Sequence, residues 1–269
     1  MKISVASLAL LGVLFSGCGG DSRVLRLATT TSTRDSGLLD VIHPTFEKEY
    51  GVRIDVIAVG TGQALKHGEA GDVDVVLVHA RSAEEAFMQA GHGVRREDVM
   101  YNTFEVLGPP SDPAGIAGLD AVPALQKIAQ GKHPFVSRGD KSGTHVKELE
   151  LWEAAGGLSE WDGYSESGQG MGETLIVADQ MHAYTLSDRG TYLAFKDKVD
   201  LAPLTKTSEE LKNPYGVIVV NPDKSDRIQH DLADAYADFL VSPATQKVIS
   251  EFQIGGETLF YPLHLPEQK

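Results

Sequence analysis

Cysteine is nearly absent from the sequence, because Cys18 is the only one in 269 residues. A lone cysteine forms no intramolecular disulfide, and it excludes metal or redox chemistry that depends on several thiols. Positive charge is scarce as well: 24 Lys and Arg stand against 38 Asp and Glu, which gives a net charge of −14. Nucleic acids and anionic membrane surfaces attract clustered positive charge, so we expect no nucleic acid and no such surface as a partner.

The N-terminal apolar run, residues 3–15, is shorter than the roughly 20 residues of a membrane-spanning helix. Its length, with Lys2 before it, is typical of the apolar region of a signal peptide. The run leads through small residues into Cys18, which resembles the lipidation site of bacterial lipoproteins. We therefore predict a lipoprotein signal peptide at 1–17, a lipidated Cys18 and a flexible tether at 18–22. An ordinary cleavage site with an incidental cysteine is the alternative.

Strand and helix patterns alternate through the rest of the chain. Apolar residues recur at every fourth position from Leu38 to Phe46, which predicts a helix that ends at Gly51. Ser82 and Glu85 have the spacing of a capping box, which predicts a helix over 82–90. The pattern favours an α/β fold with a parallel, doubly wound sheet. Strands are expected at residues 24–28, 52–56 and 73–78.

Two proline-containing segments could carry the chain between lobes. An apolar strand at 100–108 runs into the proline-rich segment 109–113, and residues 213–215 precede another apolar strand. With 42% hydrophobic residues, each lobe could bury its own core. We predict two α/β lobes joined by a two-segment hinge, with lobe I at 23–106 and 217–269 and lobe II at 107–216.

Five hydroxyl residues in a row, 29–33, follow the first expected strand. Ligands of open α/β sheets bind beyond the carboxyl ends of strands, where a helix N-terminus offers free N–H groups. Hydroxyls add donors without adding negative charge. We therefore select Thr30, Thr31 and Ser32 as candidate anion ligands and expect the next helix to start near Asp35. A threonine-rich strand end with an ordinary helix cap is the alternative.

A second donor-rich turn spans residues 137–145. It contains Ser137, Arg138 and Thr144 between a short apolar strand and a predicted helix. The guanidinium is a planar fork suited to an oxyanion, and the glycines allow backbone N–H groups to point inward. The alternative is a plain helix cap at Asp140 or Ser142, with Arg138 paired to a surface carboxylate.

Other motifs are less specific. Thr61, between two glycines after the second strand, is a candidate ligand or part of a simple turn. The glycines of 167–172 do not have the dinucleotide-binding spacing, so this segment is a turn before a helix or a pocket wall. No HExxH or GxSxG motif is present, and we expect no bound metal and no cofactor. A Ser137–His145 pair keeps an exported hydrolase open as an alternative.

The sequence resembles a known family over nearly its whole length after the signal peptide. The resemblance lies in residues 28–33, 59–62, 72–79, 137–145, 168–172, 183–191, 213–217 and 259–262. These stretches are similar to the TupA-like proteins, the tungstate-binding components of bacterial ABC importers. The resemblance implies a type II periplasmic-binding-protein fold that closes over a tetrahedral oxyanion. It implies oxyanion contacts from the Thr30–Ser32 region and from Arg138 and Thr144, whereas any contact from 179–182 stays open.

The chemistry of the candidate ligands bears on which oxyanion is bound. Tungstate and molybdate carry no proton at neutral pH, whereas hydrogen phosphate would benefit from a buried acceptor such as Asp140. We expect a monomeric, extracytoplasmic, lipid-anchored protein that captures tungstate, with molybdate as the second ligand. It would deliver the anion to an ABC permease with a cytoplasmic ATPase, and it would not be an enzyme. A phosphate or sulfate receptor of the same fold, and an adhesin-like module, are the further alternatives.

Overall fold

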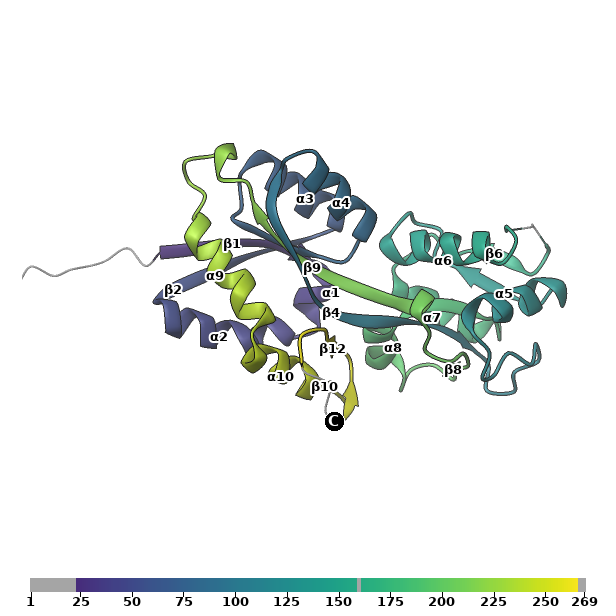
Figure 1. The fold of residues 1–269 in the computed structure, drawn as a ribbon. Helices are drawn as coiled ribbons and strands as arrows, with labels where there is room; N and C mark the ends of the chain where they lie inside the picture. The colour runs from purple at the N-terminus through teal and green to yellow at the C-terminus, as the bar shows by residue number, and fades with distance from the viewer. Residues whose placement is uncertain (1–22, 159–160, 266–269) are drawn as a thin grey trace, which may run out of the picture.

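The computed structural model describes residues 23–158 and 161–265, so the predicted signal peptide, lipidation site and tether lie outside the described residues. One eight-stranded sheet continues from one half of the molecule into the other (Figure 1). The path is β12-β4-β9-β3-β1-β2, and β7 and β8 pair with β4. The strands are β1 (Arg23–Thr30), β2 (Val52–Val59), β3 (Val75–Val78), β4 (Gly93–Gly108), β7 (Thr185–Asp188), β8 (Ala202–Pro203), β9 (Lys212–Val220) and β12 (Tyr261–Pro262).

The three strands around the hydroxyl run, β1, β2 and β3, are parallel, as predicted. β1 lies between β2 and β3, with Thr30 opposite Val59 and Thr29 opposite Leu77. The sheet as a whole is mixed, however, because β9 runs antiparallel to both β3 and β4. The prediction of a wholly parallel sheet was therefore wrong. β9 returns from the other half of the molecule, so it enters the sheet from the opposite direction.

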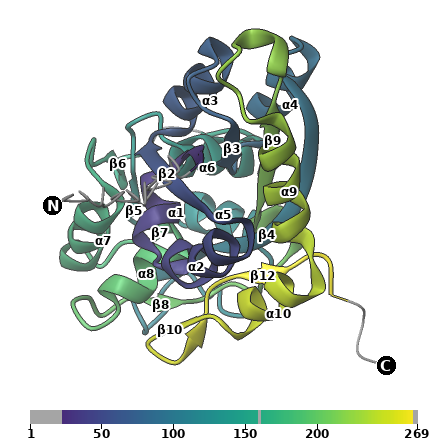
Figure 2. The same ribbon diagram turned by 90° about the vertical axis from the view of Figure 1, so that its left-hand side faces the viewer.

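Helices cover both faces of the first half (Figures 1 and 2). α3 and α4 lie on one face, and α2, α9 and α10 on the other. Alternate strand residues supply the two cores: Val76 and Ile218 pack with α3 and α4, whereas Leu77 and Val217 pack on the opposite side. The helices of this half are α1 (Thr31–Asp35), α2 (Leu38–Tyr50), α3 (Thr61–Ala70), α4 (Arg81–Gln89), α9 (His230–Val241) and α10 (Pro243–Glu251).

The second half has its own core around a small parallel pair of strands. Phe135 and Trp152 are fully or almost fully buried there, and Phe104 and Val106 of β4 join the same cluster. Separate clusters in the two halves support the proposed lobes, whose boundaries stay a prediction. The elements of this half are β5 (Phe135–Ser137), β6 (Tyr164–Glu166), α5 (Ala121–Gln130), α6 (Gly143–Ala154), α7 (Met171–Gln180) and α8 (Arg189–Phe195).

Short elements complete the fold. They are two 3₁₀ turns, Glu209–Leu211 and Pro222–Lys224, and the hairpin of β10 (Gln253–Ile254) and β11 (Glu257–Thr258). Among the described residues, none of the helices has both the length and the apolar character needed to cross a membrane.

Candidate functional site

The hydroxyl run forms the start of a helix. β1 ends at Thr30 and α1 begins at Thr31. Oγ1 of Thr30 accepts a hydrogen bond from N of Thr33 at 3.2 Å, so Thr30 is the N-cap. The amphipathic helix expected to start near Asp35 begins at Leu38, and the short helix α1, capped by this threonine, was not predicted. We call residues 30–33 the Thr30 turn.

The hydroxyls of this run serve different purposes. Thr29 donates from Oγ1 to O of Leu77 at 2.7 Å and is fully buried, so its hydroxyl belongs to the sheet. Thr31 and Ser32 are exposed. Thr30 is buried, and its Oγ1 lies 3.1 Å from Oγ of Ser32. The hydroxyl of Thr29 is thus engaged within the sheet, whereas the hydroxyls of residues 30–32 stay the predicted anion ligands.

Two neighbouring strand ends flank the Thr30 turn. Thr61 is the first residue of α3, directly after β2 and its cap residue, and it is half-buried. His79 follows β3 on the other side. Since β3, β1 and β2 are adjacent and parallel, these residues lie at the same edge of the sheet as Thr30. His79 was not among the predicted ligands. Its position at the carboxyl end of a buried strand was the signal that could have found it.

A hydrogen-bond chain fixes the imidazole of His79. Its Nδ1 lies 3.2 Å from Oδ1 of Asn213. Asn213 donates from Nδ2 to Oδ1 of Asn102 at 2.8 Å, and Asn102 donates to the hydroxyl of Tyr215 at 3.3 Å. The His79 ring stacks on Tyr215 with 4.6 Å between ring centroids. The other nitrogen, Nε2, lies 3.3 Å from Oγ1 of Thr30.

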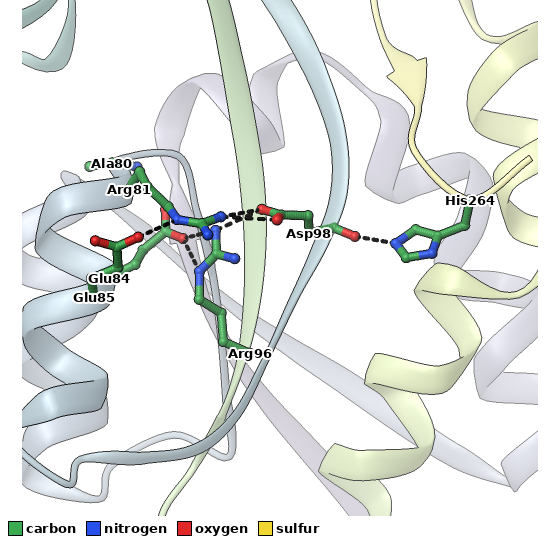
Figure 3. A network of polar contacts seen from close by, with 7 residues as sticks. All are labelled: Ala80, Arg81, Glu84, Glu85, Arg96, Asp98 and His264. Carbon is green, nitrogen blue, oxygen red and sulfur yellow. Dashed lines mark hydrogen bonds and ion pairs between the residues drawn. The ribbon is translucent and has the colours of Figure 1, made fainter.

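An ion-pair network holds the loop after His79 (Figure 3). Ala80 donates from N to Oε1 of Glu84 at 2.8 Å, and the other carboxylate oxygen of Glu84 accepts from Nε of Arg96 at 2.8 Å. Arg96 also pairs with Asp98 at 2.9 Å. The predicted capping role of Ser82 was wrong, because Ala80 is the N-cap of α4 and the carboxylate of Glu84 binds its N–H.

The second turn has left-handed backbone at two positions. Gly139 has φ of 66° and Lys141 has φ of 60°. A Cβ atom on Gly139 would lie 2.7 Å from Cβ of Glu166, so glycine is required here for space as well as for its dihedral angle. Ser142 is the N-cap of α6 and accepts from N of His145 at 3.4 Å. We call residues 137–142 the Arg138 turn.

Arg138 is partly buried, with 21% of its side chain exposed. Its Nε lies 2.9 Å from Oδ2 of Asp140 and donates to O of Gln169 at 3.4 Å. Within the residues that the structure describes, neither Nη atom has a hydrogen-bond partner. The guanidinium therefore keeps the outer part of its fork free for a ligand. The residue before α7, Gly170, is its N-cap, so a second helix N-terminus lies close to Arg138.

Ser137 lies beneath the Arg138 turn and is fully buried. Its Oγ accepts from N of Gly139 at 3.2 Å. Glu148 is also buried there, and Oε1 accepts from the hydroxyl of Tyr164 at 3.2 Å. Burial raises the pKa of Glu148 to about 7, although hydrogen bonds from Ser137 and Tyr164 oppose the shift. Glu148 was not predicted from the sequence.

The remaining predicted residues also lie at the start of α6. Thr144 is 6% exposed in the first turn of the helix. Nδ1 of His145 accepts from N of Lys141 at 3.0 Å. In the described part of the chain, His145 makes no hydrogen bond to Ser137, so the two do not form a nucleophile–base pair. No three His, Cys, Asp or Glu side chains among the described residues could hold a metal ion.

The two turns begin helices that belong to different halves of the molecule. Figure 1 places α1 on the side of the first half that faces α6 and α7. β4 and β9 pair with each other and run between the two halves, and Asn102 of β4 lies opposite Asn213 of β9. A ligand held by both turns would therefore contact both halves of the molecule.

Comparison with known proteins identifies the family of the chain. The PBP superfamily domain matches residues 20–244. The tungstate-binding protein TupA of Peptoclostridium acidaminophilum is 49% identical over 243 residues, which cover 89% of this chain and 84% of the relative. The chain belongs to the TupA family. The predicted periplasmic-binding-protein fold is confirmed as well, and the TupA relatives are binding proteins rather than hydrolases.

Solved structures of the TupA family agree with the fold. TupA from Desulfovibrio alaskensis G20 has a TM-score of 0.87 at 45% identity, covering 90% of this chain and 99% of that one. The structure described as the tungstate ABC transporter from Geobacter sulfurreducens has a TM-score of 0.76 at 54% identity, covering 85% and 98%. At these identities the likeness extends along most of both chains.

Proposed function

We propose that this protein captures tungstate, with molybdate as the second ligand, and delivers it to the permease of an ABC importer. The relatives named for tungstate binding support the choice of ligand. The observation that carries the proposal is the pair of donor-rich turns, one in each half of the molecule. Each lies where a strand passes into a helix, and together they offer hydroxyls from the Thr30 turn and a guanidinium fork from the Arg138 turn.

Donors dominate both turns, and this favours an anion that carries no proton. Asp140 is the one carboxylate in the Arg138 turn, and it is the feature that would suit hydrogen phosphate. Its Oδ1 accepts from N of Ser142 at 3.0 Å, and its Oδ2 lies 2.9 Å from Nε of Arg138. Burial alone would raise the pKa of Asp140, but the Ser142 bonds and the Arg138 charge lower it overall. Both oxygens of this ionised carboxylate are already engaged within the turn, which reduces its capacity to accept a proton from hydrogen phosphate.

The seven predicted ligand residues fall into two roles in this proposal. Six of them contact the anion, namely Thr30, Thr31, Ser32, Thr61, Arg138 and Thr144. Ser137 supports the Arg138 turn from below, because its hydroxyl accepts from Gly139. Sulfate is disfavoured by size, since a site spaced for tungstate leaves its hydrogen bonds too long.

The negative net charge of the chain does not prevent anion binding. Exposed charges more than about 10 Å apart are largely screened at 0.1 M salt. Hydrogen bonds to a charged group contribute roughly 1.5–3 kcal/mol each when they are shielded from water. Local donors at the two turns therefore outweigh the distant acidic surface.

Isothermal titration calorimetry with four anions tests the function. We expect saturable heat with tungstate and molybdate, and none with phosphate or sulfate at the same concentrations. Saturable binding of phosphate without binding of either metal oxyanion would assign the site to a phosphate receptor of the same fold. Hydrolysis of a phosphate or carboxylic ester that is abolished by Ser137→Ala would assign it to an enzyme.

The setting of the protein is part of the same proposal. An extracytoplasmic, monomeric receptor anchored through a lipid on Cys18 would hold the site close to the permease. Mass spectrometry of the membrane fraction tests the anchor: the wild type should carry a diacylglycerol adduct on Cys18, and Cys18→Ala should be released into the soluble fraction. A wild type recovered without the adduct would contradict lipidation, but it would not contradict the proposed anion site.

A further inference from the structure

His79 lies among the hydroxyls proposed to bind the anion. Its Nε2 is 3.3 Å from Oγ1 of Thr30 and 3.5 Å from Oγ of Ser32. The ring cannot turn away easily, because it stacks on Tyr215 at an interplanar angle of 28° and is bonded through Nδ1. Any group that Nε2 offers is therefore directed into the space beside the Thr30 turn.

The opposite nitrogen decides what Nε2 can offer. Nδ1 faces Oδ1 of Asn213, and an amide oxygen only accepts hydrogen bonds. The amide is held in this orientation because its Nδ2 donates to Asn102. Nδ1 therefore carries the hydrogen in every protonation state. In the neutral imidazole Nε2 has a lone pair and accepts a hydrogen bond, whereas in the imidazolium it carries a hydrogen and donates one.

A hydroxyl of the Thr30 turn that donates to Nε2 cannot give the same hydrogen to an anion. A hydroxyl has a single hydrogen. In the free protein Thr30 or Ser32 can give that hydrogen to the lone pair of Nε2. When an oxyanion arrives, the hydroxyl hydrogens are needed by its oxygens, and the lone pair of Nε2 would face negative charge. Protonation of Nε2 removes this conflict and adds a donor.

The charges around His79 agree with a proton that is taken up on binding. Burial lowers the pKa of His79, more than the Asn213 bond and the charge of Asp188 raise it. Of the elements packed against the ring, β7 supplies Asp188, whereas the neighbours on α1, β4 and β9 are uncharged hydroxyl, amide and phenol groups. The free protein thus keeps His79 neutral near pH 7, and a dianion beside Nε2 would be the second negative charge that favours the imidazolium.

We propose that His79 is a ligand of the bound oxyanion and that it donates from Nε2–H after taking a proton from solvent. The inference rests on the proposed tungstate function and deepens it, because capture of the anion becomes coupled to proton uptake. By reciprocity, a lower pH strengthens binding. Affinity falls as pH rises through the interval between the pKa of His79 in the free protein and its higher pKa in the complex, by at most about tenfold per pH unit.

Calorimetry in paired buffers tests the proposal on the full mature chain. Tungstate is titrated between pH 6 and 8.5 in two buffers that differ in ionisation enthalpy, so that the difference in heat gives the protons taken up. We expect tighter binding at low pH and a net proton uptake for the wild type. His79→Gln keeps an amide donor but does not titrate, so it should take up fewer protons per tungstate and have a flatter pH profile. His79→Ala should bind about ten- to a hundredfold more weakly at pH 6.

His67→Gln is the matched control, because His67 lies on α3 and its Nδ1 is 3.5 Å from Oδ2 of Asp72, away from the Thr30 turn. It should keep the wild-type profile and proton number. A His79→Gln variant with the wild-type proton number and slope would overturn the proposal, and so would a wild type that binds tungstate with no dependence on pH or buffer. A wild type that binds no metal oxyanion at any pH would instead overturn the proposed function itself.

Discussion

Glu84 and Arg96 form a buried ion pair directly behind the loop that carries His79. Oε2 of Glu84 lies 2.6 Å from Nη2 of Arg96, and Glu84 is fully buried. The pair lies against β9 at Gly216, where an added Cβ atom would collide with both side chains. Because Oε1 of the same carboxylate binds the N–H of Ala80, the ion pair connects the end of β3 to β4. The ion pair therefore holds the loop that carries His79 beside the Thr30 turn.

Removing the charge of Glu84 should destabilise the protein strongly. Glu84→Gln leaves the Arg96 guanidinium buried beside a neutral group, and breaking a buried pair in this way costs about 3 kcal/mol or more. Urea unfolding followed by circular dichroism measures the change. Glu85→Gln is the control, since Glu85 pairs with Arg81 at the surface and is 51% exposed, and its loss should cost less than about 1 kcal/mol. Equal costs would mean that the buried pair does not stabilise the loop.

A side chain at Gly139 should disturb the Arg138 turn. Gly139→Ala places Cβ on a residue with φ of 66° and 2.7 Å from Glu166, and we expect a loss of roughly 1–3 kcal/mol in unfolding free energy. Gly143→Ala is the matched control in the first turn of α6, where no atom lies within 4 Å of the added Cβ. It should leave the melting temperature unchanged or slightly higher. A Gly139→Ala protein as stable as Gly143→Ala would contradict the backbone description.

The sequence was informative wherever the signal is local. The Arg138 turn was found because its glycines, serines and arginine follow a short strand and precede a helix within nine residues of chain, 137–145. The Thr30 turn was found for the same reason, but the short helix α1 that begins there was not predicted. Threonine favours strands as well as caps, and only the bond from Thr33 to Thr30 shows which preference prevails.

Features that depend on distant pairing could not be predicted. The direction of β9 is set by its pairing with β3, and nothing within 212–220 determines it. The role of His79 depends on Asn213, which lies 134 residues further along the chain. Glu148 looked like one more acidic residue on a helix, and only the packing of Tyr164 over it reveals that it is buried. The direction of β9, the contacts of His79 and the burial of Glu148 all depend on neighbours in the tertiary structure.

The raised pKa of Glu148 should make stability fall as pH increases. Its pKa is about 7 in the folded protein against an ordinary value of 4.5, so the folded state holds the proton more tightly than the unfolded state does. The stabilisation is complete below about pH 4.5 and is lost as pH rises through 7, which amounts to about 2–3 kcal/mol between pH 5 and 8. Glu148→Gln should lack this loss in urea unfolding.

Glu150→Gln provides the comparison on the same helix. Glu150 is 59% exposed and pairs loosely with Lys147, so its variant should keep the wild-type pH dependence. If Glu148→Gln and Glu150→Gln have the same slope between pH 5 and 8, Glu148 is ionised in the folded protein throughout this range. In that case the carboxylate would have found a donor that offsets its burial.

Arg138 and Lys141 offer the sharpest test of the second turn, because both are cations in the same six-residue segment. The free Nη atoms of Arg138 should bind the oxyanion, whereas Lys141 is exposed and contributes only its backbone. Arg138→Ala should weaken tungstate binding about 30- to 150-fold by calorimetry, as expected for the loss of a charge-assisted bond of about 2–3 kcal/mol. Lys141→Ala should change the affinity less than about threefold, since an exposed charge is screened by salt. Arg138→Lys keeps the charge but loses the planar fork, so it should fall between the two. Equal losses in the two alanine variants would mean that the turn attracts the anion by net charge alone. Arg138 would then not be a ligand of the anion.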